Sequence, residues 1–233
     1  MNPLVSIIMP TYNRAEYIME ALNSIKRQTF KDYEIIVVDD GSTDNTKEIA
    51  AACEGIRYIC LDHGGIARAR NTAVKAAKGK WIAFLDSDDL WKEDKLQKQV
   101  DYVRTHPDCR IVYTDFKNFT EIPEEELDER QKGLLKSDIS WYLPSALVDA
   151  RLFAEVGLFD KKYKFNEDTE WNFRLKFYQV NMGHCIHEAL YLRRVHASNI
   201  TNSGAGLYST DIRNLALEAY RKVRKLRKVT ETL

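Results

Sequence analysis

Short apolar runs alternate with helical segments through the first 104 residues, and this alternation constrains the fold more than any other feature. The runs have the length and β-branched content of buried strands, and they occupy residues 4–9, 34–38, 56–61 and 81–85, with a later run at 111–113. Helix-forming patterns lie between them, at residues 18–25, 46–52 and 67–77. We therefore predict an α/β fold in which helices flank a mostly parallel central sheet. Ligand sites of such folds lie at the carboxyl ends of the strands.

The pattern weakens after residue 113 and returns after residue 145. Residues 121–130 are acidic and contain Pro123, which predicts a surface loop or a short exposed helix. Further on, residues 149–156 and 167–178 favour helices, and residues 185–195 favour a strand. The length of 233 residues suits one domain, which we place at residues 1–205.

A basic amphipathic helix is predicted within residues 206–233, over about 209–228. One stripe of this helix is apolar, and it consists of Ile212, Leu215, Ala219, Val223 and Leu226. Its final turns carry six basic residues, which are Arg221, Lys222, Arg224, Lys225, Arg227 and Lys228. Such a helix fits peripheral contact with an anionic membrane. It equally fits docking on the domain with a solvated basic side.

Composition limits the partners and the compartment of the chain. The 35 basic residues cancel the 35 acidic ones, so no overall field attracts nucleic acid, and we expect no nucleic-acid partner. The four cysteines lack CxxC pairing and lie in or beside apolar stretches, as free thiols do in a reducing compartment. No apolar run approaches the roughly 18 residues of a membrane span. We expect a cytoplasmic protein, at most peripheral on the inner face of a membrane, and the composition leaves homo-oligomers open.

Two polar clusters follow the first two predicted strands and can share one pocket. The first contains Pro10, Thr11, Tyr12 and Asn13, and the second begins at Asp39. A carboxylate such as Asp39 can accept the imide N–H of uracil, while Thr11 offers a hydroxyl and Tyr12 a stacking face. Residues 42–44 also fit a turn and helix cap, and we adopt that interpretation for them.

The fourth predicted strand runs directly into Asp86, Ser87, Asp88 and Asp89. Three carboxylates within four residues repel one another unless a cation lies among them. Their hard oxygen ligands suit Mn²⁺ or Mg²⁺, which could bridge the two phosphates of a nucleotide diphosphate. The alternative is a strand end that caps a helix at about residues 92–104. The position of the cluster in the predicted sheet favours the metal.

Several short motifs resemble those of family 2 glycosyltransferases of the GT-A fold, and they follow one another in the same order as in that family. The resemblance covers about residues 4–201. The motifs are Pro10-Thr11-Tyr12-Asn13-Arg14, Val38-Asp39-Asp40-Gly41-Ser42, Ala69-Arg70-Asn71, Gly79, the DXD-containing Leu85-Asp86-Ser87-Asp88-Asp89, Val156-Gly157-Leu158-Phe159-Asp160 and Glu167-Asp168. The resemblance implies a nucleotide-binding half at about residues 1–115 and an acceptor-binding half at about 116–205.

The resemblance also implies a role for each matching residue. Thr11 and Asp39 contact the base, Arg70 supports that site, Asp86 meets the ribose, and Asp88 binds the metal. Asp168 is the catalytic base, with neighbouring Glu167 as the next candidate. His196 matches a position that closes over the diphosphate or metal, although an ordinary surface histidine is an equal alternative.

The local sequence around Asp168 allows a purely structural interpretation. Acidic residues are favoured at a helix start by the macrodipole and the free N–H groups. The same environment holds a carboxylate ionised, as a base must be. Trp171, Leu175 and Tyr178 would anchor one face of the helix and fix Asp168 in place.

Other candidate motifs carry less weight. His184, Cys185 and His187 resemble zinc ligands, but no second ligand pair has suitable spacing, so we interpret them as strand residues. Gly64-Gly65 belongs to neither a dinucleotide-binding motif nor a P-loop. Trp141, Tyr142 and Trp171 could form a flat acceptor surface or belong to the core.

The function expected from these residues is metal-dependent transfer of one sugar, with inversion, from a nucleotide diphosphate to a hydroxyl acceptor. We expect UDP as the nucleotide, and a glycan or a lipid-linked glycan as the acceptor. Two alternatives remain, a nucleotidyltransferase and a nucleotide-sugar-binding module without catalysis. The first lacks a Gly-rich, Lys-containing loop after the first strand, and the presence of both Asp88 and Asp168 argues against the second.

Overall fold

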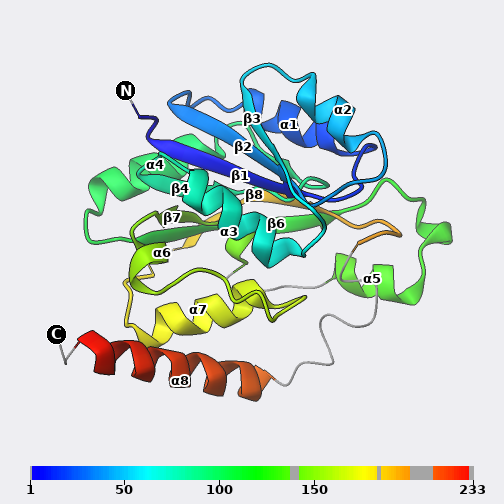
Figure 1. Ribbon diagram of the computed structural model, residues 1–233. Helices are drawn as coiled ribbons and strands as arrows, with labels where there is room; N and C mark the ends of the chain where they lie inside the picture. The colour runs from blue at the N-terminus through cyan, green and yellow to red at the C-terminus, as the bar shows by residue number, and fades with distance from the viewer. Residues whose placement is uncertain (1, 137–141, 183–184, 200–211, 231–233) are drawn as a thin grey trace.

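A computed structural model describes residues 2–136, 142–182, 185–199 and 212–230, with side chains through residue 224 of the last segment (Figure 1). Eight strands form one sheet in the order β3-β2-β1-β4-β7-β6-β8-β5. They are β1 (Val5–Thr11), β2 (Tyr33–Asp39), β3 (Ile56–Cys60), β4 (Trp81–Phe84), β5 (Leu90–Trp91), β6 (Ile111–Phe119), β7 (Leu147–Asp149) and β8 (Cys185–Arg194).

Helices cover both faces of the sheet. They are α1 (Ile18–Lys26), α2 (Thr46–Ala51), α3 (Ile66–Ala76), α4 (Lys95–Thr105), α5 (Glu129–Leu135), α6 (Leu152–Glu155), α7 (Glu167–Phe177) and α8 (Ile212–Thr230), with short 3-10 turns at Glu124–Glu126 and Leu143–Ser145. One core cluster packs α1 and α4 on the sheet, and a second packs α3, α6 and α7. The structure confirms the predicted α/β fold.

The parallel part of the sheet is its first half. β3, β2, β1 and β4 are mutually parallel neighbours, and the residues of β1 are buried throughout. β7 then runs antiparallel to both β4 and β6, while β8 lies parallel to β6 and antiparallel to β5. Sequence analysis did not predict the short strands β5 and β7, because two or three residues are too few to show periodicity. β7 occupies the start of the predicted helix 149–156, so only α6 remains helical there.

The acidic segment after β6 is largely exposed, as predicted, with a 3-10 turn at Glu124–Glu126. α5 then begins with a reciprocal capping box. The Asp128 carboxylate accepts the backbone N–H of Gln131, and the Gln131 side chain accepts the N–H of Asp128. This pairing satisfies two N–H groups that a helix start otherwise leaves free.

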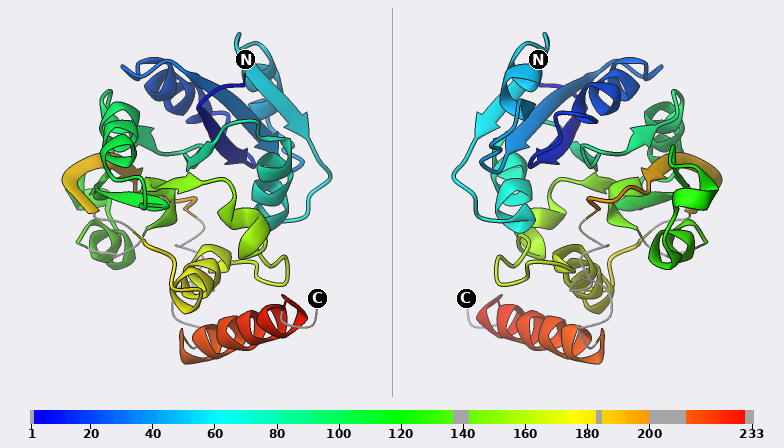
Figure 2. Two further views of the ribbon diagram at one scale, coloured as in Figure 1. Left: turned by 90° about the vertical axis from the view of Figure 1, so that its left-hand side faces the viewer. Right: turned by 90° about the vertical axis from the view of Figure 1, so that its right-hand side faces the viewer.

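α8 docks on α7 at the far side of the molecule from β1 to β3 (Figure 2). The stripe residues Leu215, Ala219 and Val223 are buried, which corresponds to the docking alternative for this helix. Lys222 donates to Asp160 at 2.6 Å and to the fully buried Glu170 at 2.9 Å. Residues 206–211 and the side chains of residues 225–230 lie outside the described part of the chain. Among the described residues, no helix has the length and apolar character needed to span a membrane.

Candidate active site

A cavity of about 1110 Å³ opens at the carboxyl ends of β1, β2 and β4, beside the start of α7. Because the carboxyl ends of parallel strands meet at one edge of a sheet, this is where sequence reasoning placed the site. The cavity lining includes most of the candidate residues, namely Pro10, Thr11, Tyr12, Asn13, Arg70, Asp86, Ser87, Asp88, Glu167 and Asp168. Asp39 and His196 lie behind the lining.

Asp39 and Asp40 divide their roles at the end of β2. The buried Asp39 carboxylate accepts the N–H of Ser42 at 2.8 Å and the hydroxyl of Tyr58 at 2.5 Å. Asp40 lines the cavity instead, where its carboxylate accepts the N–H groups of Gly64 at 3.0 Å and Gly65 at 2.7 Å. Sequence reasoning did not single out Asp40, and no spacing distinguishes two adjacent aspartates.

Thr11 and Tyr12 line the cavity with side-chain groups that a ligand can contact. Thr11 is buried, and within the described residues its hydroxyl oxygen has no hydrogen-bond partner. Buried polar atoms are normally paired, so this hydroxyl is available to a ligand. The Tyr12 ring is 40% exposed and lies against the His63 imidazole with ring centroids 4.4 Å apart. A planar base could extend that stack.

Asn13 connects the loop after β1 to the loop after β2. It adopts a left-handed conformation with φ of 51°, and its side-chain oxygen accepts the N–H of Thr43 at 2.8 Å. Its own N–H donates to the hydroxyl of Ser42 at 2.8 Å. Asp44 accepts the N–H of Thr46 at 3.0 Å. These contacts agree with a turn at residues 42–44, but the N-cap of α2 is Asn45, without a side-chain capping hydrogen bond, so the cap expected at Ser42 or Asp44 is displaced by one residue or more.

The three carboxylates after β4 have separate partners. Arg70 donates to Asp86 at 2.9 Å, and Arg14 donates to Asp88 at 2.9 Å. Asp89 is buried and accepts the Tyr191 hydroxyl at 2.6 Å, and burial together with nearby carboxylates raises its pKa well above the usual range. Arg14 and Arg70 therefore provide part of the positive charge that offsets the repulsion among these carboxylates. Asp89 has a structural position, whereas Asp86 and Asp88 line the cavity.

Asp88 and His196 contact each other at the cavity wall. The Oδ2 atom of Asp88 lies 3.1 Å from the Nε2 atom of His196, and both side chains are largely buried. The same Oδ2 atom also accepts the Nε–H of Arg14 at 2.9 Å, so a divalent cation bound to this carboxylate would have to replace these contacts. Ser198 contacts the Nδ1 atom of His196 at 2.9 Å, and the Tyr17 ring packs against the imidazole. The histidine is thus oriented toward Asp88 and is not an ordinary surface residue.

A buried arginine links Asp86, which follows β4, to the start of α7. Arg70 on α3 donates to Asp86 and, at 2.5 Å, to Glu167, and all three side chains lie in or beside the cavity wall. Burial raises the pKa of Glu167 to about 7, although the charge of Arg70 opposes the shift. Glu167 is only 3% exposed.

Asp168 is the more accessible of the two carboxylates at the start of α7. It is partly exposed and lines the cavity, and it accepts the N–H of Thr169 at 2.7 Å. The helix behind it is firmly held, because buried Trp171 donates to the carbonyl of Gly157 at 2.7 Å and Leu175 is fully buried. The predicted anchoring of α7 is confirmed, and Trp171 belongs to the core, not to an acceptor surface.

The side of the cavity next to α7 contains residues that sequence reasoning did not single out, namely Lys161, Tyr163, Lys164 and Phe165. Tyr142, which the sequence offered as a candidate flat surface, lines the cavity from the segment before β7. Trp141 lies outside the described residues. In the sequence, only the mixture of basic and aromatic residues at 161–165 could have pointed to this surface, and that mixture matches no known motif.

Burial of Glu167 predicts a specific pH dependence of stability. Its pKa is about 7 in the folded state and about 4.5 unfolded, so between these values the folded state retains a proton that the unfolded state has lost. Raising the pH through this window therefore lowers the free energy of unfolding. We expect Glu167→Gln to flatten that decline in urea unfolding between pH 5 and 8, whereas the exposed-site control Glu93→Gln should retain it. An unchanged slope in Glu167→Gln would contradict the assignment.

Comparison with known proteins agrees with this geometry. The family model for glycosyl transferase family 2 matches residues 6–157, which span β1 to α6. The chain belongs to glycosyl transferase family 2. It is 35% identical over 217 residues to an uncharacterized glycosyltransferase of Rickettsia prowazekii, an alignment that covers 87% of this chain and 67% of the relative.

Two further comparisons involve UDP or a UDP-sugar by name. The Escherichia coli WfaP protein, a UDP-Glc:alpha-D-GlcNAc-diphosphoundecaprenol beta-1,3-glucosyltransferase, is 41% identical over 119 residues, covering 50% of this chain and 46% of WfaP. The S. aureus TarS 1-349 structure in complex with UDP is 26% identical with a TM-score of 0.66, covering 84% of this chain and 61% of that one. The protein is therefore a family 2 glycosyltransferase, and it spans only part of these two relatives.

Proposed function

We propose that this glycosyltransferase moves a sugar from UDP to an acceptor hydroxyl, with inversion and with Mn²⁺ or Mg²⁺. The observation that carries the proposal is that one cavity is lined both by Asp88, which contacts His196 just behind the wall, and by an accessible carboxylate, Asp168. The unpaired Thr11 hydroxyl and the exposed Tyr12 ring support binding of the base in the same cavity. Asp40 lies beside them in the cavity wall, where its carboxylate is held by Gly64, Gly65 and His63, and the buried Asp39 lies behind it.

Each step of the proposed reaction can be assigned to particular residues of the chain. Asp168 takes the proton of the acceptor hydroxyl, whose oxygen then forms a bond to the anomeric carbon as the bond to the diphosphate breaks. Attack from the face opposite the leaving group inverts the anomeric centre. A cation held by Asp88 and His196 would stabilise the negative charge of the departing UDP. Arg70 keeps Asp86 and Glu167 in place around the donor.

The acceptor half supports an anionic acceptor, such as a lipid-linked glycan that carries a diphosphate. Lys161 and Lys164 line the cavity, and within the described chain neither has an ion-pair or hydrogen-bond partner. Tyr163 and Phe165 add flat apolar surface between and beside them. The donor and acceptor halves at about residues 1–115 and 116–205, and peripheral membrane contact through α8, remain parts of this proposal.

The cation requirement gives the direct test of the proposal. We expect calorimetry to show that UDP binds with Mn²⁺ and loses affinity when EDTA removes the ion. Asp88→Ala should bind UDP weakly under both conditions, because the ion has lost its carboxylate ligand. The exposed-carboxylate control Asp101→Ala should behave as wild type. Equal affinity of the wild type with and without EDTA would exclude metal-assisted donor binding.

The nucleotide itself can be identified by thermal stabilisation. A ligand at about 100 times its dissociation constant adds roughly 2.7 kcal/mol to the free energy of unfolding. Screening UDP, GDP and CDP with Mn²⁺ should therefore single out UDP by the largest rise in melting temperature. A larger rise with GDP or CDP would replace UDP in the proposal.

A further inference from the structure

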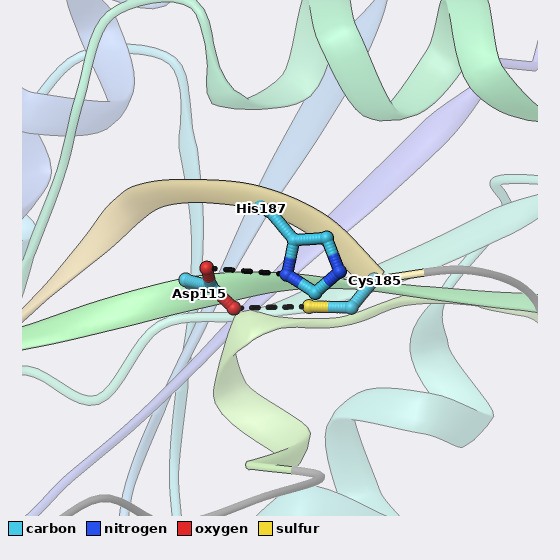
Figure 3. Close-up of side chains that lie close together, drawn as sticks. All are labelled: Asp115, Cys185 and His187. Atoms are coloured by element: carbon cyan, nitrogen blue, oxygen red, sulfur yellow. Dashed lines mark hydrogen bonds and ion pairs between the residues drawn. The ribbon is translucent and has the colours of Figure 1, made fainter.

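Three metal-binding side chains meet at the start of β8 (Figure 3). Cys185 and His187 extend from β8 toward Asp115 on the neighbouring strand β6. The Sγ atom of Cys185 lies 3.2 Å from Oδ1 of Asp115, and the Nδ1 atom of His187 lies 3.5 Å from Oδ2. One ligand atom from each of the three residues lies within 4.8 Å of the others.

An irregularity in strand pairing brings these side chains together. Cys185 and His187 are two residues apart, so an extended strand directs both to one face. The parallel pairing of β6 with β8 matches Thr114 to Ile186 and then Asp115 to Ala189, so β8 contains extra residues at 187 and 188. Such bulges redirect side chains. The third ligand comes from another strand, and for this reason spacing within residues 184–187 did not reveal it.

We propose that Asp115, Cys185 and His187 bind Zn²⁺. Bond lengths of about 2.0 to 2.3 Å in a tetrahedral site place ligand atoms roughly 3.3 to 3.6 Å apart. The two spacings above end on different oxygens of Asp115, but one atom of each residue already lies within 4.8 Å of the others, so small side-chain rotations would bring the three ligand atoms to these distances. One thiolate and one carboxylate would balance the 2+ charge of the ion. The His187 side chain is 71% exposed and the Asp115 side chain 47%, so water can occupy the fourth position. Glu188 pairs with Lys98 instead.

This site is chemically and spatially separate from the Asp88–His196 pair. His196 follows the carboxyl end of β8, whereas Cys185 and His187 lie at its beginning. The carboxylate of Asp88 is a hard ligand that suits Mn²⁺ or Mg²⁺, whereas a thiolate is a soft ligand that favours Zn²⁺. A bound ion would fasten the bulged start of β8 to β6, and sugar transfer would not require it.

Cobalt titration of the full chain distinguishes the two sites. Co²⁺ replaces Zn²⁺ in tetrahedral sites, and thiolate ligation produces a charge-transfer absorption band that oxygen and imidazole ligands do not. We expect one equivalent of Co²⁺ to produce this band in the reduced wild-type protein, and Zn²⁺ to abolish it by competition. Cys185→Ser should lose the band, whereas the matched control Cys60→Ser, which removes an exposed free cysteine, should keep it.

Two further variants test the other ligands. Asp115→Asn and His187→Gln retain the thiol, and each should weaken Co²⁺ binding by roughly 100-fold or more, beyond the usual cost of losing an outer partner. Circular dichroism confirms that each variant is folded. Absence of the band in the wild type, its persistence in Cys185→Ser, or wild-type affinity in both other variants would overturn the proposal and leave a hydrogen-bonded surface cluster.

Discussion

Asp168→Asn should lower the turnover of sugar transfer by about 10² to 10⁴-fold, the usual effect of removing a general base. Asparagine retains the shape and can still accept the Thr169 N–H that Asp168 accepts. Fold and UDP affinity should therefore survive, and only proton abstraction should be lost. Melting temperature, UDP affinity and transfer are measured on the same preparation.

Glu167→Gln is the matched control for that experiment. Glu167 is buried against Arg70, so its amide should change stability and its pH dependence more than turnover. A transfer rate near wild type in Asp168→Asn, with a large loss in Glu167→Gln, would move the role of base to Glu167. Equal losses in both variants with reduced UDP affinity would indicate a damaged cavity and not a missing base.

Arg70→Met should reduce stability by about 3 to 5 kcal/mol, because it leaves the buried Glu167 and the partly exposed Asp86 without their cation. Arg70 donates to Asp86 at 2.9 Å and to Glu167 at 2.5 Å, and its side chain is 3% exposed. Methionine has similar volume, so the loss reports the charge more than a cavity. For a chain of this size we expect the melting temperature to fall by roughly 6 to 20 °C.

The control for Arg70→Met is Arg68→Met, on the same helix. Arg68 donates to the backbone carbonyl of Asp62 at an exposed position, so its loss should cost far less. Adding Glu167→Gln to Arg70→Met should restore part of the stability, since one unpaired carboxylate is then neutral. A similar change in melting temperature for Arg68→Met and Arg70→Met would show that the buried ion pairs contribute little.

Strand periodicity predicted the donor half of the fold well, because each of its strands is long enough to show a pattern. β1, β2 and β4 form the predicted sheet edge, and the polar residues after them line the cavity. Sequence could not assign β5 and β7, whose two or three residues are held by neighbours in space. Pairing across the sheet, not local propensity, determines such strands.

Within the candidate site, the predictable part was which segments meet. Motif order led to Asp88, His196 and Asp168, but only the fold shows that Asp88 contacts His196, more than a hundred residues further along the chain. Likewise, adjacency in sequence could not show that Asp40 lines the cavity whereas Asp39 pairs with Tyr58 behind it. Side-chain direction at a strand end depends on tertiary contacts that no spacing encodes.

The docking of α8 has a consequence for how substrate preference can diverge. Glu218 on α8 pairs with Lys162 and accepts the Tyr163 hydroxyl, while Lys222 pairs with Asp160. The cavity-lining segment at residues 161–165, which we propose faces the acceptor, is thus braced by α8 from outside the sheet. Under the proposed function, substitutions on α8 reshape this wall without touching residues 10–13, which we propose bind the nucleotide. We therefore expect variants or chimeras of α8 to change acceptor preference while they retain the donor.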